Sequence, residues 1–131
     1  MRTFRNIEGL GRAVGTHLGH SSWHTVTQQR IDAFAEATGD HRCGYLPLTL
    51  LPLLEGEVYQ IDGLTMGVNY GANKVRFPSP VPVGSRVRAG VELVSLVAGG
   101  NGHLLTTRIT IERENAEKPS CVAESLSLLV P

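Results

Sequence analysis

The sequence has 131 residues, of which 41% are hydrophobic and 18% are charged, and its basic and acidic residues balance to a net charge of zero. This length matches the common size of one domain and is enough to bury a core without disulfides or metals. The charge balance excludes the basic excess of nucleic-acid binders, and no polybasic run is present to hold an anionic membrane surface. We therefore predict a single domain over residues 1–131 that binds neither nucleic acid nor membranes.

The cysteines and histidines suggest no metal or disulfide site. Cys43 and Cys121 are far apart and form no CxxC pair, which argues against a disulfide scaffold and a zinc site. His17, His20 and His24 are separated by glycine and serines that oppose a helix, and no fixed carboxylate or cysteine joins them. The N-terminus has no signal-peptide core, and the longest apolar run is too short for a bilayer. We expect a cytoplasmic protein with reduced thiols and no bound metal.

The first half of the chain predicts two helices. Thr27 offers a hydroxyl at an N-cap position, and apolar residues follow at spacings of three and four, so we predict an amphipathic helix over residues 28–38. Leucines cover every side of residues 45–57, which predicts one helix that is buried all round. Pro52 should kink this helix or end it nearby. A short strand is the competing interpretation, but the length and the leucine content favour a helix.

The second half predicts strands, because its segments are rich in Val, Ile, Thr and Leu and are separated by turn residues. The predicted strands are 22–26, 64–70, 73–77, 85–97, 104–113 and 120–130. In the fourth, Val87 to Ser95 alternates between two faces, as expected of a strand with one buried side. A central apolar helix followed by long antiparallel strands predicts an α+β protein in which a curved sheet wraps the helix, the hotdog arrangement.

Three stretches carry a family resemblance: VTQQRIDAFAEATGDH at 26–41, GVNYGANKVRFPSPVPVG at 67–84, and KPSCVAES at 118–125. Together they resemble the MaoC-like dehydratases, and in particular the single-hotdog (R)-specific enoyl-CoA hydratases. The resemblance implies a hotdog homodimer that acts on acyl-CoA thioesters. It implies no cofactor, because the substrate itself carries coenzyme A.

The resemblance also implies a catalytic pair, and here the sequence departs from the family. The family motif places an Asp after Thr-Gly and a His five residues later. The two side chains hold and deprotonate a water while a backbone N–H near the central helix polarises the thioester carbonyl. Asp40 matches the Asp, but Tyr45 stands five residues later. Only Arg42 and Cys43 join TGDH to GYLPLTLLPLL, so by resemblance roughly twenty residues with the His are absent, against typical connections of about 4–6 residues.

The residues around this junction are the first candidates for the site. Asp40 is either the catalytic carboxylate or a helix-end acid in water. His41 is a weak replacement base, because adjacent side chains on an extended loop point apart. Tyr45 offers a hydrogen-bond donor but is a poor base at neutral pH, and a core aromatic at the helix start is the other interpretation. Gly44 could supply the backbone N–H for the thioester oxygen.

A second group of candidates lies in VNYGANKVRF. Asn69, Tyr70, Lys74 and Arg76 are predicted to bind substrate. Lys74 and Arg76 are two residues apart, so in a regular strand they share a face, and two cations there suit the phosphates of coenzyme A. An ordinary solvated face that pairs with glutamates is the alternative.

These observations predict an enoyl-CoA hydratase or dehydratase whose activity is low or absent as the sequence stands. The alternative is a non-catalytic hotdog dimer or acyl-CoA-binding module. A thioesterase is a third possibility, because one fold can host several functions.

Overall fold

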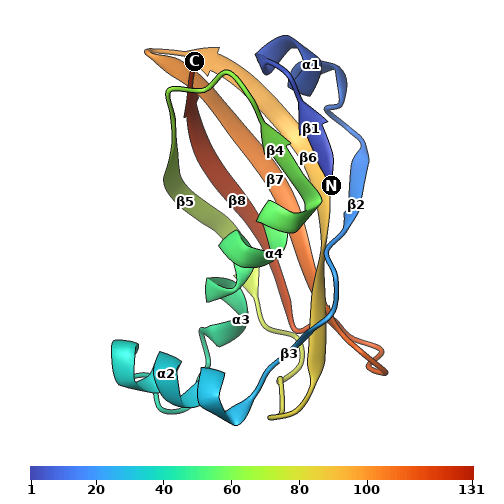
Figure 1. Ribbon diagram of the computed structural model, residues 1–131, viewed down its shortest axis with the longest axis vertical. Helices are drawn as coiled ribbons and strands as arrows, with labels where there is room; N and C mark the ends of the chain where they lie inside the picture. The colour runs from blue at the N-terminus through green and yellow to red at the C-terminus, as the bar shows by residue number, and fades with distance from the viewer.

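A computed structural model describes residues 1–131, and its main element is a curved antiparallel sheet (Figure 1). The six strands are β2 (His17–His20), β3 (His24–Thr25), β5 (Met66–Arg76), β6 (Arg86–Gly99), β7 (Gly102–Arg113) and β8 (Cys121–Val130). The order across the sheet is β2-β6-β7-β8-β5, and β3 also pairs with β6. The strands β2 and β5 therefore form the two edges. This arrangement confirms the predicted α+β hotdog fold.

The predicted strands 85–97, 104–113 and 120–130 are confirmed as β6, β7 and β8 within a few residues. The segments 64–70 and 73–77 form one strand, β5, instead of two. The N-terminal helix α1 (Ile7–Arg12) and the small parallel pair of β1 (Arg2–Phe4) with β4 (Tyr59–Ile61) were not predicted. Such short elements carry too few residues for a periodic pattern to be visible.

The helix predicted over 28–38 is confirmed as α2 (Gln28–Thr38). Thr27 caps it, because its hydroxyl accepts a hydrogen bond from the N–H of Arg30 at 3.1 Å. Gly39 ends it with φ of 75°, a left-handed conformation that glycine adopts without steric penalty. The helix has no fully buried residue and lies at one end of the sheet (Figure 1).

The central segment forms two short helices instead of the one helix predicted over 45–57, and the break that we expected near Pro52 is confirmed. The helices are α3 (Leu46–Thr49) and α4 (Leu51–Val58), and they meet at Leu50. Pro52 explains the break, because it has no N–H for the carbonyl of Leu48 and its ring crowds that carbonyl. The N–H of Leu50 turns instead to the carbonyl of Pro47, three residues back, at 3.2 Å.

The core lies between these helices and the concave face of the sheet, as predicted. Its residues come from the central leucines and the inward positions of the long strands: Val26, Leu46, Leu50, Leu51, Leu54, Val58, Val87, Ala89, Val91, Ile109, Ile111, Cys121 and Ala123. A fully buried leucine contributes about 1.5–3 kcal/mol to stability, so this segment is a main source of the folding free energy. Leu53 is the exception, being 42% exposed on the side of α4 away from the sheet.

A bulge in β6 interrupts the alternation between two faces that we predicted for that strand. Val87, Ala89, Val91 and Leu93 are all buried, but the register with β7 shifts between Leu93 and Ser95. The extra residue moves Ser95 out of phase, and Leu96 packs against a second group of buried residues, which includes Leu10 of α1.

No helix in the structure combines the length and the apolar content that a membrane crossing needs.

Candidate active site

Asp40 lies in the turn between α2 and α3 and is half-buried. Its carboxylate Oδ2 accepts a hydrogen bond from the backbone N–H of Tyr45 at 3.1 Å. Its own N–H donates to the hydroxyl of Thr38, also at 3.1 Å. The carboxylate therefore has a fixed position between the end of one helix and the start of the next, where it accepts one of the N–H groups that a helix start leaves without a partner.

The turn that follows Asp40 is tight. The N–H of Cys43 donates to the carbonyl of Asp40 at 3.2 Å, and Cys43 has a positive φ of 55°. A left-handed conformation costs a non-glycine residue about 1–2 kcal/mol. The short connection between α2 and α3 therefore contains a strained backbone conformation at Cys43.

A cavity of about 470 Å³ opens beside Asp40. Six residues line it: Phe34, Thr38, Gly39, Asp40, Tyr45 and Thr49. Asp40 is the one carboxylate among them. His41 is exposed and is not part of the lining, as expected from the divergence of adjacent side chains. The structure therefore brings Asp40 together with Tyr45 but leaves His41 outside.

Tyr45 is not the core aromatic that the sequence suggested. Its side chain is 62% exposed, and its ring packs edge-on against Phe77, with centroids 5.9 Å apart. Tyr45 directly precedes α3, and the buried side of that helix is taken by Leu46 and Pro47. Since the core side is already filled, the Tyr45 ring lies over the surface beside the small cavity.

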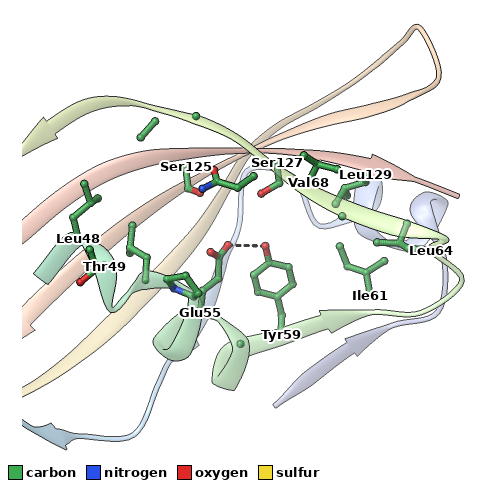
Figure 2. A pocket seen from close by; sticks show the side chains of 17 residues that line it. Leu48, Thr49, Glu55, Tyr59, Ile61, Leu64, Val68, Ser125, Ser127 and Leu129 are labelled. Atoms are coloured by element: carbon green, nitrogen blue, oxygen red, sulfur yellow. Dashed lines mark hydrogen bonds between the residues drawn. The ribbon is translucent and has the colours of Figure 1, made fainter. Parts of the chain in front are cut away.

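A larger cavity of about 820 Å³ lies between the central helices and the strands β5 and β8 (Figure 2). Its lining comes from α3, α4, β4, β5, β8 and the connection between β4 and β5: Leu48, Thr49, Leu51, Pro52, Glu55, Gly56, Tyr59, Ile61, Leu64, Gly67, Val68, Asn69, Gly71, Ala72, Ser125, Ser127 and Leu129. Thr49 lines both cavities, so the two adjoin at the end of α3.

A half-buried acid on α4, Glu55, and a half-buried tyrosine at the start of β4, Tyr59, lie on one wall of the larger cavity, and the sequence did not reveal them. The hydroxyl of Tyr59 donates to Glu55 Oε1 at 2.7 Å, and the hydroxyl of Thr107 donates to the same oxygen at 3.3 Å (Figure 2). Burial raises the pKa of Glu55, an effect that outweighs the lowering by these two hydrogen bonds. Burial and the neighbouring Glu55 charge also raise the pKa of Tyr59. A glutamate four residues before a tyrosine in an apolar helix is the signal that could have indicated this pair.

Glu55 and Asp40 line different cavities. Asp40 is in the lining of the smaller cavity and Glu55 is in the lining of the larger one, and neither acid is in both. Groups that share a proton transfer lie within hydrogen-bond reach of the same atoms. The two acids therefore serve different parts of the adjoining cavities.

The candidates on β5 divide between the cavity and the surface. Asn69 lines the larger cavity. Tyr70 occupies a bulge between Asn69 and Gly71 and is 65% exposed. These two residues are adjacent, but the bulge gives them different surroundings.

The predicted shared face of Lys74 and Arg76 rests on a regular alternation that the structure interrupts. The register with β8 shifts between Asn73 and Arg76, and Lys74 has a positive φ of 53°. The Lys74 ammonium lies 3.9 Å from a carboxylate oxygen of Glu124, while its side chain stays 77% exposed. Lys74 therefore has a glutamate neighbour, as expected if this is an ordinary solvated face whose cations pair with glutamates. The spacing of two no longer indicates by itself that both cations face the same way.

Comparison with known proteins extends these observations, although no family model matches the sequence. The chain is 43% identical to 3-hydroxyacyl-thioester dehydratase Z of Mycobacterium tuberculosis, over 96% of this chain and 97% of that protein. The chain belongs to the MaoC-like dehydratase family.

Solved structures of the family agree with the fold. A MaoC-like dehydratase from Rhodospirillum rubrum aligns with a TM-score of 0.63 and 16% identity, over 96% of this chain and 98% of that one. The R-hydratase PhaJ1 from Pseudomonas aeruginosa aligns with a TM-score of 0.64 and 18% identity, over 89% and 81%. At these identities the likeness shows the hotdog fold alone.

The sequence alignment also shows a difference in length within the family. It runs over 146 positions but takes in only 96% of 131 residues, so about twenty positions hold no residue of this chain. This number equals the shortening that the family resemblance led us to expect.

Proposed function

We propose that this protein binds acyl-CoA thioesters in the two adjoining cavities and interconverts 2-enoyl and (R)-3-hydroxyacyl thioesters at a strongly reduced rate. The observation that carries the proposal is the position of Asp40, whose carboxylate lines a cavity at the start of the central helices. The 43% identity to a protein named as a 3-hydroxyacyl-thioester dehydratase supports the same chemistry.

In the hydration direction, Asp40 takes a proton from water as the oxygen bonds to C3. The electrons of the double bond move toward the thioester carbonyl, whose developing negative charge needs a hydrogen-bond donor. We assign that role to the backbone N–H of Gly44, at the start of the central helices. Transfer of the proton from Asp40 to C2 completes the addition, and the reverse order gives dehydration. No step requires a cofactor beyond the coenzyme A that the substrate carries.

The proposed rate is low because Asp40 acts alone where the family uses an aspartate together with a histidine. We place the alignment positions without a residue in this chain between His41 and Gly44, where the family carries its histidine. A positioned acid or base contributes about 10²–10⁴-fold to a rate, which corresponds to about 3–5.5 kcal/mol of barrier. His41 is exposed and Tyr45 is a weak base, so neither replaces this group.

Binding depends less on that segment than turnover does. Asn69 lines the larger cavity, and Tyr70, Lys74 and Arg76 follow on the same edge strand. We assign to these cations the phosphates of coenzyme A, with Lys74 exchanging its contact with Glu124 for the ligand. A substrate that carries coenzyme A, together with two unpaired cysteines, fits a cytoplasmic location.

We also infer a homodimer that forms along β5. This strand is an edge of the sheet, and it carries the exposed apolar side chains Met66, Val68 and Tyr70. An exposed strand edge with apolar side chains favours pairing with another chain. Zero net charge leaves little long-range repulsion between copies.

The second candidate is an acyl-CoA-binding dimer without catalysis. The lining of the small cavity favours it, since that lining contains Asp40 and no histidine. A slow hydratase and a non-catalytic binding dimer would both bind acyl-CoA, but only the hydratase would turn it over.

The experiment is hydration of crotonyl-CoA, followed by the loss of enoyl absorbance. Three proteins are compared: the chain as it stands, Asp40→Asn, and a chain with a family-type histidine-bearing loop restored between His41 and Gly44. We expect negligible rates for the first two and a clear gain for the third. Robust activity of the unmodified chain that Asp40→Asn abolishes would contradict the reduced rate and make Asp40 sufficient. No gain from the restored loop, with acyl-CoA binding intact, would favour the binding module.

A further inference from the structure

The larger cavity has a polar centre between two apolar ends. Leu48 of α3 lies at one end, while Ile61, Leu64 and Leu129 lie at the opposite end (Figure 2). Between them, Glu55 and Tyr59 on the helical side face the serines of β8 across the cavity. We call these four residues, Glu55, Tyr59, Ser125 and Ser127, the polar belt. An unsubstituted alkyl chain matches the two ends of the cavity but not the belt.

Glu55 is held firmly by one of its two oxygens. Oε1 accepts hydrogen bonds from the hydroxyls of Tyr59, at the start of β4, and of Thr107, on β7. Thr107 is 1% exposed, and the ring of Tyr59 packs edge-on against Phe4 at 6.4 Å. Both donors are therefore fixed by the core, and the Glu55 carboxyl group has a defined orientation in the cavity wall.

The other oxygen, Oε2, has no hydrogen-bond partner within the chain and is not one of the fully buried polar atoms, so it stays accessible from the cavity. A ligand that covers such an atom without offering a partner costs about 1–3 kcal/mol, more when the group is charged. Burial also raises the pKa of Glu55, which favours the protonated carboxyl group. In that form the group can donate one hydrogen bond and accept others from the cavity side.

We propose that Glu55 is a specificity residue that selects acyl chains bearing a hydroxyl or carbonyl oxygen part-way along the chain, at the level of the polar belt. This inference rests on the proposed binding of acyl thioesters. The oxygen concerned is distinct from the 3-hydroxyl of the reaction, because Glu55 lines the larger cavity and Asp40 lines the smaller one. A neutral oxygen fits better than an ammonium group, since the facing serines both donate and accept hydrogen bonds.

The preference for oxygenated over plain acyl chains follows from the cost of leaving a polar atom without a hydrogen-bond partner. A plain alkyl chain expels water from the belt and leaves Oε2 without a partner, whereas an oxygenated chain replaces that water. A site built to hydrogen-bond a hydroxyl rejects the ligand that lacks it more strongly than an apolar site rejects an added methylene. We expect a preference of at least about fivefold in Kd for the best oxygenated chain.

The test is calorimetric titration with dodecanoyl-CoA and with a series of dodecanoyl-CoA thioesters hydroxylated at each carbon from the fifth to the twelfth. The protein is used as the intact chain, alongside Glu55→Leu and Glu55→Gln. Glu55→Gln keeps a group that donates and accepts in the same place, while Glu55→Leu removes it. Glu57→Gln is the matched control, because Glu57 is on the same helix but hydrogen-bonds Ser22 and His24 outside the cavity lining.

We expect at least one hydroxylated chain to bind tighter than dodecanoyl-CoA to the unmodified protein, to Glu55→Gln and to Glu57→Gln. Glu55→Leu should lose this preference and bind dodecanoyl-CoA at least as well. If Glu55→Leu unfolds, Ser127→Ala on the opposite wall should reduce the same preference. Equal affinity for all chains in the unmodified protein would overturn the inference and leave the proposed function standing, whereas absence of binding to any of them would overturn both.

Discussion

Asp40 joins α2 to α3, because its carboxylate Oδ2 accepts the backbone N–H of Tyr45 at 3.1 Å. The residue that the family resemblance marks as catalytic therefore also has a structural role in this chain. The bond supplies a partner to a helix start that has no side-chain cap of its own at Tyr45. Substitutions of Asp40 should affect stability as well as any turnover.

Asp40→Ala is expected to lower the free energy of unfolding by about 1 kcal/mol, the usual worth of one such hydrogen bond. For a domain of this size that loss corresponds to a fall in Tm of about 4 °C. Urea denaturation followed by circular dichroism measures the change. Glu36→Gln is the control, since Glu36 is an exposed residue on α2 and should leave the midpoint unchanged. An unchanged midpoint for Asp40→Ala would mean that the bond to Tyr45 contributes nothing to stability.

Glu55, half-buried in the cavity wall, should give the free energy of unfolding a distinct dependence on pH. Its pKa is raised in the folded protein, so the folded state keeps a proton that the unfolded state has already lost. The associated stability is fully present below the unfolded pKa of about 4.5 and is lost as the pH rises through the folded pKa. Glu55→Gln cannot titrate, so it should gain stability relative to the unmodified protein as the pH rises.

Urea unfolding at several values between pH 4 and pH 8 tests this dependence. Glu57→Gln is expected to change with the opposite sign, because hydrogen bonds from Ser22, the largest effect, and from His24 lower the pKa of Glu57. The stability due to Glu57 is present above the unfolded pKa and is lost as the pH falls through the folded one. Parallel curves for Glu55→Gln and the unmodified protein would contradict the raised pKa of Glu55.

The two cysteines should differ sharply in reactivity. Cys121 is 1% exposed, and burial raises the pKa of its thiol to about 11. Cys43 is half-buried in the turn after Asp40. Because the thiolate is the reactive form, iodoacetamide at pH 8 should label Cys43 and spare Cys121 in the folded protein. Mass spectrometry identifies the labelled residue, and Cys43→Ser should abolish labelling until urea is added.

Tyr70→Asp is expected to convert the proposed dimer into a folded monomer. Tyr70 is 65% exposed on the edge strand β5, where a charge opposes pairing between two copies. Sedimentation velocity at micromolar concentration measures the state of the protein. Val97→Asp is the matched control, because Val97 is 59% exposed but lies near the β6–β7 turn, away from β5. A monomeric unmodified protein, or a dimer that Tyr70→Asp leaves intact, would refute association along β5.

The candidate site was predictable only in part. The motif around Asp40 identified that residue and the absence of a histidine five positions later, because both are properties of local order in the sequence. The exposure of Tyr45 was not predictable, since it depends on Leu46 and Pro47 already filling the core side of α3. The spacing of Lys74 and Arg76 did not by itself decide whether the two side chains share a face, for a similar reason. A bulge set by pairing with β8 interrupts the alternation between them.

The sequence by itself determined the α+β class, the helix over 28–38 and the buried faces of β6 and β7, because each rests on periodicity and capping that neighbouring residues carry. Only the tertiary structure decided that Glu55 faces Ser125 and Ser127 across a cavity, since these residues are far apart in the chain and meet through the curvature of the sheet. It likewise decided which oxygen of Glu55 is satisfied, because Thr107 reaches it from another strand. Local order specifies the elements, whereas the chemistry of the cavity depends on long-range packing.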